Sequence, residues 1–185
     1  MSKIITGKVL SVQLGREETR LVLLNDGAQI LHAASMATPA GAVEDGMIRN
    51  PDAIREMLKG VRKDPAFQKV RKVVFALCTS QVITEVVTIP DLPKAKLGKL
   101  LKANADMYFP VDTQDHQMVW QVIEPKVTDG IKELSVRLWA VPKAMLTHYY
   151  KVANACGFSV AAIDYCGHGM ATLAGATFAK PGKAA

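Results

Sequence analysis

Alternating apolar and polar positions in the first part of the chain predict three consecutive β-strands. The segment 8–14 alternates loosely with the period of two of a half-buried sheet, and 19–24 and 28–34 are predicted as the second and third strands. Gly15 ends the first segment, and Asn-Asp-Gly at 25–27 separates the second from the third. These residue types tolerate the positive φ of a tight turn. We therefore expect an antiparallel meander.

A helix and a buried strand follow the meander. The segment 39–50 is irregular, with Pro39, Gly41 and Gly46, and Asn50-Pro51 then suits the cap and first turn of a helix. Apolar residues recur on one face of that helix, at positions 54, 57, 58 and 61. The run at 73–77 is short and β-rich, which favours a buried strand.

The segment 82–112 predicts a strand, a helix and an aromatic-proline corner. The strand at 82–89 is stopped by prolines, which cannot donate to a sheet ladder. A helix is expected from 94 to 107, with leucines on its apolar face. Tyr108-Phe109-Pro110 ends it, because proline disfavours helix at the residue before it.

The last third of the chain predicts two strands, a helix, a strand and a second helix. Strands at 117–123 and 131–141 are joined across Thr128-Asp129-Gly130, and an amphipathic helix spans 143–156. A strand at 159–163 and a buried helix at 170–178 follow. Asp164 is the only charge between 152 and 179, but its central position and several glycines favour a core over a membrane span.

Composition favours a globular chain in a reducing compartment. Of its 185 residues, 49% are hydrophobic, which is too many for a disordered chain. The three cysteines, Cys78, Cys156 and Cys166, are an odd number in apolar surroundings, so we expect them reduced and the protein cytoplasmic. No cysteines or histidines have metal-ligand spacing, and no metal site is predicted.

The net charge of +6 comes with two basic clusters. They are Lys59, Arg62, Lys63, Lys69, Arg71 and Lys72, and then Lys94, Lys96, Lys99 and Lys102. Each cluster could be a solvated helix face, or could meet an anionic bilayer or an acidic partner. Nucleic acid is not expected, because no aromatic residues interleave with the lysines.

One stretch of the chain resembles a known family. FALCTSQVITEVVTIPDLPKAKLGKLLKANADMYFPVD, at 75–112, is similar without gaps to the corresponding part of the PilM family of type IV pilus assembly proteins. A looser resemblance runs from SVQLG at 11–15 to AIDYCGHGMATLAGA at 162–176.

The resemblance implies an α/β (α+β) fold. Proteins similar to PilM and to the cell-division protein FtsA have an actin-like, ribonuclease-H-like lobe with a small inserted α+β subdomain of the FtsA (SHS2) type. By that likeness, 1–80 and 157–180 form the lobe. Residues 81–156 form a ββα-type insertion, and 181–185 are a tail or linker.

The first hairpin matches a degenerate phosphate loop. Actin-like proteins typically cradle nucleotide phosphates in a D-x-G hairpin followed by small hydroxyl residues, and Gln13, Gly15 and Thr19 occupy those positions here. Gln13 lacks the charge of the aspartate, and two of the intervening residues are Glu17 and Glu18, which would repel a triphosphate.

The degenerate loop bears on activity. No catalytic residue or cofactor is predicted, so the chain is expected not to be an enzyme. ATP and magnesium are implied only if a second lobe exists. The alternative is a truncated actin-like ATPase whose second nucleotide-binding lobe is absent from this chain.

The resemblance also implies a role and a partner. We expect a cytoplasmic scaffold, peripheral at the inner face of the cytoplasmic membrane, that binds the N-terminal cytoplasmic peptide of a PilN-like bitopic membrane protein. Other pilus-platform proteins are further expected partners. Tyr108, Phe109 and Pro110 are the candidate groove-lining residues. The same three residues could instead pack the end of their helix.

Overall fold

The computed structural model describes residues 7–26 and 29–167, which form two compact units. The first unit comprises Met1–Thr79 and Thr147–Ala185, and the second comprises Ser80–Leu146. The predicted helix at 170–178 and tail at 181–185 lie outside the described residues, as does part of the turn predicted at 25–27.

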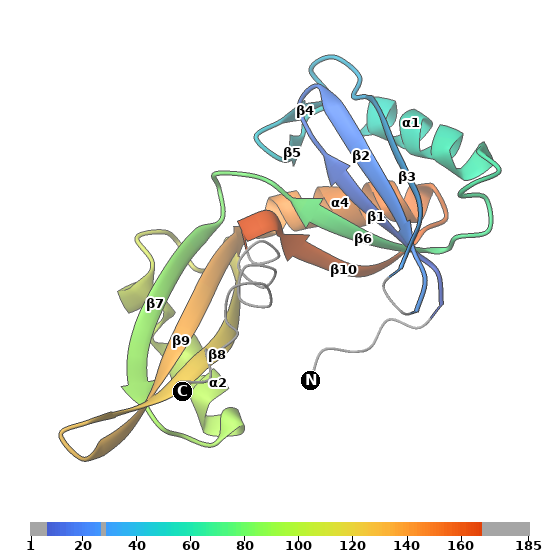
Figure 1. Cartoon of the computed structure of the whole chain (residues 1–185). Helices are drawn as coiled ribbons and strands as arrows, with labels where there is room; N and C mark the ends of the chain where they lie inside the picture. The colour runs from blue at the N-terminus through green and yellow to red at the C-terminus, as the bar shows by residue number, and fades with distance from the viewer. Residues whose placement is uncertain (1–6, 27–28, 168–185) are drawn as a thin grey trace. The chain divides into compact units, whose positions relative to one another are not determined.

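A five-stranded sheet forms the centre of the first unit (Figure 1). Its strand order is β10-β6-β1-β2-β3. The strands are β1 (Val9–Leu14), β2 (Glu18–Leu24), β3 (Ile30–Ala37), β6 (Lys72–Leu77) and β10 (Ser159–Tyr165). The first three strands are antiparallel to one another, which confirms the predicted meander, and β6 runs parallel to both β1 and β10. The carboxyl ends of β1, β6 and β10 therefore meet at one edge of the sheet.

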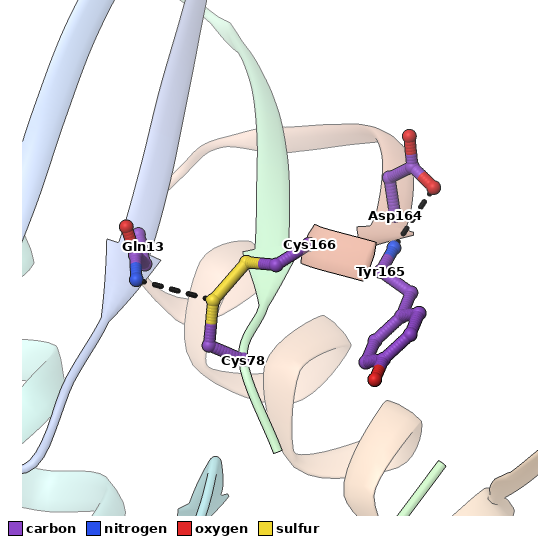
Figure 2. The surroundings of a disulfide bond; sticks show 5 residues. All are labelled: Gln13, Cys78, Asp164, Tyr165 and Cys166. Atoms are coloured by element: carbon purple, nitrogen blue, oxygen red, sulfur yellow. Dashed lines mark hydrogen bonds between the residues drawn. A yellow bond between two sulfur atoms is a disulfide. The ribbon is translucent and has the colours of Figure 1, made fainter. Parts of the chain in front are cut away.

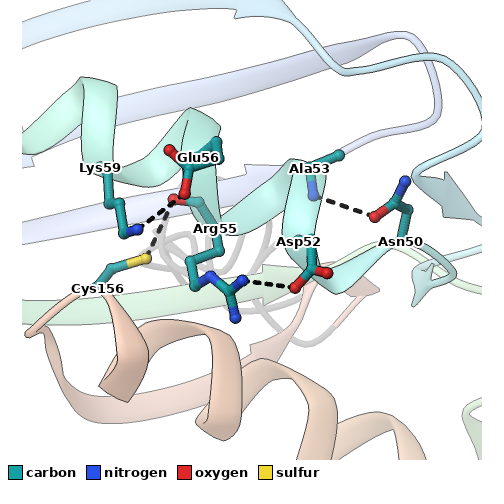
Figure 3. Close-up of polar contacts among 7 residues, drawn as sticks. All are labelled: Asn50, Asp52, Ala53, Arg55, Glu56, Lys59 and Cys156. Atoms are coloured by element: carbon teal, nitrogen blue, oxygen red, sulfur yellow. Dashed lines mark hydrogen bonds and ion pairs between the residues drawn. The ribbon is translucent and has the colours of Figure 1, made fainter.

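Helix α1 (Pro51–Lys63) contacts the residues that directly follow helix α4 (Lys143–Ala155) in the first unit. Asn50 caps α1, because its side-chain oxygen accepts a hydrogen bond from the backbone N–H of Ala53 at 3.1 Å. The thiol of Cys156, just after α4, donates to the Arg55 carbonyl of α1 at 3.3 Å (Figure 3). Burial raises the pKa of this thiol.

The predicted inserted segment, 81–156, extends further than the second unit, which ends at Leu146. The difference lies in α4, most of which belongs to the first unit. Its Tyr149 ring meets the Phe75 ring of β6 edge-on, with ring centroids 4.9 Å apart. Amphipathic periodicity placed this helix correctly but could not show which unit its apolar face covers.

A short hairpin lies within the segment that was predicted to be irregular. Strands β4 (Val43–Glu44) and β5 (Met47–Ile48) pair across Asp45 and Gly46, whose φ angles are 44° and 73°. Positive φ at both central positions is the geometry of a type I′ turn, which Asp-Gly favours. The Asp-Gly signal was present in the sequence, but strands of two residues are too short to give a hydrophobic period.

The second unit is a three-stranded sheet of order β7-β9-β8 with two helices. Its elements are β7 (Ile83–Pro90), α2 (Lys94–Ala103), α3 (Ala105–Tyr108), β8 (His116–Thr128) and β9 (Ile131–Pro142). The predicted helix at 94–107 is therefore divided at Asn104, where ψ is 16°. Strand β8 continues past its predicted end at 123 and includes Pro125, which an edge strand can accommodate.

One cluster of buried side chains holds the second unit together. It consists of Ile89, Leu97, Leu101, Phe109, Val136, Leu138 and Ala140. These residues come from both helical and strand segments, so the sheet and α2 share a single core. Among the described residues, no helix is long and apolar enough to span a bilayer.

Tyr149 links the β4–β5 hairpin to α4, and its hydroxyl group can be tested separately from its ring. The buried hydroxyl donates to the Gly46 carbonyl at 2.8 Å. We expect Tyr149→Phe to lower the free energy of unfolding by about 1–3 kcal/mol, because it leaves that carbonyl without its partner. Urea denaturation measures the change. Tyr150→Phe is the control. That side chain is 45% exposed, so removal of its hydroxyl group should change the free energy of unfolding little.

The same tyrosine gives a pH signature. Burial raises the pKa of Tyr149 above its ordinary value. The stability that comes from keeping the phenol neutral is therefore fully present below the unfolded pKa of about 10 and is lost as the pH rises through the folded pKa. Tyr149→Phe should flatten this alkaline loss, whereas equal alkaline loss in both proteins would contradict the assignment.

Candidate functional site

The carboxyl edge of the parallel strands is where the predicted phosphate loop lies. Gln13, near the end of β1, uses its side-chain amide in a contact within the chain. Its side-chain N–H donates to the sulfur of Cys78 at 3.2 Å (Figure 2). Cys78 immediately follows β6, which is the parallel neighbour of β1.

Cys78 is joined to Cys166 by a disulfide, which corrects the expectation of three reduced cysteines. The physical reason is the sheet register. Leu77 of β6 pairs with Tyr165 of β10, so the residue after each strand lies beside the other, with Cα atoms 5.4 Å apart. Each cysteine directly follows a predicted or observed strand, but only the strand order reveals that the two strands are neighbours.

Gly15 closes the β1–β2 turn instead of leaving its amide free for a phosphate. Its backbone N–H donates to the Glu18 carbonyl at 3.0 Å. A Cβ at this position would lie 2.5 Å from the same oxygen. The glycine is therefore required by the turn itself.

Thr19 is fully buried, and its hydroxyl group is already engaged. It shares a hydrogen bond of 2.8 Å with the hydroxyl of Thr38, a residue that sequence reasoning did not single out. Gln13, Gly15 and Thr19 thus lie on one hairpin, as predicted, but each makes its polar contacts within the chain.

The turn also presents negative charge. Hydrogen bonds from Ser35 and Arg20, together with the Arg20 charge, lower the pKa of Glu18. The Arg20 side-chain nitrogen lies 2.9 Å from the Glu18 carboxylate. Glu18 is therefore ionised at neutral pH, next to the glycine where a nucleotide phosphate would approach.

The aromatic-proline corner lies in the second unit, and its three residues differ in exposure. Phe109 is 3% exposed and belongs to the unit's core cluster, so it offers almost no surface to a peptide. Tyr108 is half-buried against that cluster, and Pro110 is exposed. Phe109 thus packs the end of its helix, which was the alternative to a role in lining a peptide groove.

The second basic cluster lies on α2 and is exposed. Lys94, Lys96, Lys99 and Lys102 are all on the surface, while Leu97 and Leu101 of the same helix are buried. The helix contains no acidic residue and therefore presents a cationic face. In the described part of the chain, no three His, Cys, Asp or Glu residues are grouped so that they could hold a metal ion.

Comparison with known proteins gives a family and a fold. The sequence profile of the family described as "Type IV pilus assembly protein PilM" matches residues 11–177. No curated protein sequence gives a significant match.

Several solved structures resemble this chain, and two of them are informative. One is a PilM-PilN type IV pilus biogenesis complex, with a TM-score of 0.72 and 20% identity, covering 88% of this chain and 48% of the other. The second is the cytoplasmic domain of EpsL, an inner-membrane component of the type II secretion system of Vibrio cholerae. Its TM-score is 0.54 at 17% identity, with coverage of 85% and 57%. The chain thus spans about half the length of these structures. Its fold is an actin-like, ribonuclease-H-like lobe with an inserted small α+β subdomain of the FtsA (SHS2) type.

The role of Gly15 can be tested by adding one methyl group. Gly15→Ala should lower the free energy of unfolding by about 1–3 kcal/mol, because the new Cβ overlaps the Glu18 carbonyl oxygen. Urea denaturation of the two proteins measures the difference.

Gly60 provides a matched control with the opposite expected sign. It lies inside α1, and no atom would come within 4 Å of an added Cβ. Gly60→Ala should therefore stabilise the protein by about 0.5–1 kcal/mol through helix propensity. Equal effects of the two substitutions would show that the turn does not depend on Gly15.

Proposed function

Since the chain belongs to the PilM family of type IV pilus assembly proteins, we propose that it is a cytoplasmic scaffold of the pilus inner-membrane platform. In this role it binds the N-terminal cytoplasmic peptide of a PilN-like bitopic membrane protein and is held by that partner at the inner face of the membrane. The observation that carries the proposal is the family match across both units, 11–177. The likeness of fold to a PilM-PilN complex supports the choice of partner.

Short peptides are captured by main-chain hydrogen bonds together with a few apolar anchors. In the second unit, the side chain of Tyr108 is half-buried, and Pro110 next to it in the chain is exposed. A half-buried tyrosine is held in place by the core while its remaining surface can still contact a ligand. Phe109 supports this corner from inside the core. We therefore assign peptide contact to Tyr108 and Pro110 and a packing role to Phe109.

A scaffold role accounts for the phosphate-loop hairpin better than ATP hydrolysis does. Gln13 supplies no charge for a metal ion, the Gly15 amide closes its own turn, and the Thr19 hydroxyl is buried on Thr38. To bind a nucleotide here, the chain would have to break these contacts while bringing phosphates close to an ionised Glu18. These three groups stabilise the hairpin and are therefore not preorganised donors for a triphosphate.

The peptide proposal is tested by titration calorimetry. The ligand is a synthetic peptide with the N-terminal cytoplasmic sequence of the PilN-like protein from the same genome. We expect saturable binding, weakened on the order of tenfold by Tyr108→Ala if this tyrosine is an anchor. Tyr150→Ala, which removes an exposed tyrosine from α4, should leave the affinity unchanged. A heat signal that is no larger for this peptide than for a scrambled one, at high micromolar concentration, counts against the proposal.

The alternative function, an actin-like ATPase that needs a second lobe, is tested with fluorescent ATP. Titration of this chain and of the longest natural reading frame, with and without magnesium, should show no saturable binding. Magnesium-dependent saturation that Gln13→Ala abolishes would instead identify a nucleotide site at this hairpin. The substitution removes the side-chain amide while leaving Gly15 and Thr19 in place.

A further inference from the structure

The disulfide at the carboxyl edge of the first unit differs from a buried structural bridge in its exposure. Cys78 is exposed to solvent, and Cys166 is half-buried. Cys156, the third cysteine, is buried and its thiol donates to the Arg55 carbonyl. The chain therefore contains an accessible sulfur pair and an enclosed thiol within one unit.

A hydrogen-bond donor is placed on the more exposed sulfur. The Gln13 amide donates to the Cys78 sulfur at 3.2 Å (Figure 2). A hydrogen bond to the charged form of a group favours that form, so the same donor would stabilise a Cys78 thiolate once the bond opens. Gln13 is thus a positioning residue whose partner is sulfur.

We propose that Cys78–Cys166 is a thiol–disulfide exchange site that reacts with small thiols and with dithiol reductases. Exposed disulfides exchange more readily than enclosed ones, and disulfides in a reducing compartment are typically transient or redox-sensing. The compartment argument rests on the proposed cytoplasmic function, whereas the exposure and the Gln13 contact do not.

The exchange proceeds in two balanced steps. An external thiolate attacks the exposed Cys78 sulfur, a mixed disulfide forms, and the electron pair of the broken bond leaves on Cys166, which takes up a proton. A second external thiolate attacks the external sulfur of the mixed disulfide and releases Cys78, beside the Gln13 donor. The protein gains two electrons and two protons, and two external thiols become one external disulfide.

Opening the bond changes the connectivity of the chain. The two cysteines are 88 residues apart, and the loop between them includes the whole second unit, Ser80–Leu146. The oxidised bond closes this loop at the ends of two neighbouring strands, β6 and β10. Because cross-linking restricts the unfolded chain, we expect oxidation to raise the Tm on the order of 10 °C.

The experiment equilibrates the full chain, natively folded, in mixtures of reduced and oxidised glutathione or dithiothreitol. Samples are acid-quenched, unfolded and labelled with a maleimide reagent that adds mass to each free thiol. We expect a reversible change between one labelled thiol (Cys156) in oxidising mixtures and three in reducing mixtures. In Cys156→Ser the change should run from none to two. In Cys78→Ser, equilibrated with reduced and oxidised dithiothreitol because it leaves no stable mixed disulfide on Cys166, the count should stay at two.

The role of Gln13 has its own readout, the pH dependence of alkylation at Cys78 in the reduced protein. Gln13→Leu keeps a side chain of similar size but removes the donor. We expect it to shift the rate profile to higher pH and to slow alkylation at neutral pH by about 3–10-fold, as a raised thiol pKa requires. Alkylation at Cys166 serves as the internal comparison.

Two results would overturn the proposal. Both cysteines could remain free thiols in excess oxidised glutathione, which would mean that the pair does not form a disulfide. Alternatively, the bond could persist in millimolar reduced dithiothreitol and open only after unfolding, which would identify a structural bridge. Neither result depends on the partner peptide, so each is distinguishable from failure of the scaffold proposal.

Discussion

The parallel pairing of β6 with β1 on one side and β10 on the other is the constraint on which the first unit depends. Strand β6 alternates buried and half-buried residues, and Val73, Phe75 and Leu77 form its buried face. The chain leaves β6 to build the complete second unit and then returns through α4 to place β10 against the same strand. Parallel neighbours require such a crossover, which explains why a self-contained unit with its own core can be inserted at this point. The pairing also brings the residues after β1, β6 and β10 to one edge, where the site lies.

At that edge the chain satisfies its own polar groups. Buried donors and acceptors are costly to leave unpaired, and the first hairpin pairs them internally through the Gly15–Glu18 and Thr19–Thr38 hydrogen bonds. A phosphate-binding loop needs the opposite arrangement, in which backbone and hydroxyl donors stay open toward a ligand. The hairpin thus keeps the shape of the actin-like lobe without its open donors. The proposed scaffold role requires no open donors at this hairpin and is compatible with that arrangement.

Much of the fold follows from local sequence signals with a clear physical cause. Asn50-Pro51 begins α1, and Asp129-Gly130, with φ of 52° and 79°, forms the β8–β9 turn because both residue types accept positive φ. Signals of this kind act over a few residues. The β4–β5 hairpin and the break at Asn104 escaped prediction because their elements are too short to show a hydrophobic period.

The features that sequence reasoning missed depend on contacts between distant segments. Nothing near Cys78 indicates that Cys166 will lie beside it, because that follows from the order of strands in the sheet. The same applies to Tyr149, whose helix packs on β6 and the β4–β5 hairpin, and to Thr38 as the partner of Thr19. Gln13 was singled out as a phosphate-loop residue, and the structure shows its amide on a sulfur atom that follows another strand.

Gln13 connects the predicted phosphate-loop position with the sulfur pair. An aspartate at this position, as in typical actin-like proteins, would carry a negative charge within reach of the Cys78 sulfur, where the Gln13 amide now lies at 3.2 Å. Like charges so close raise the pKa of a thiol and disfavour its thiolate, which is the form that exchanges. A neutral amide removes that repulsion and adds a donor. Glutamine at position 13 thus places a neutral donor, and not a carboxylate, beside the Cys78 sulfur, which makes this edge of the sheet compatible with reactive sulfur.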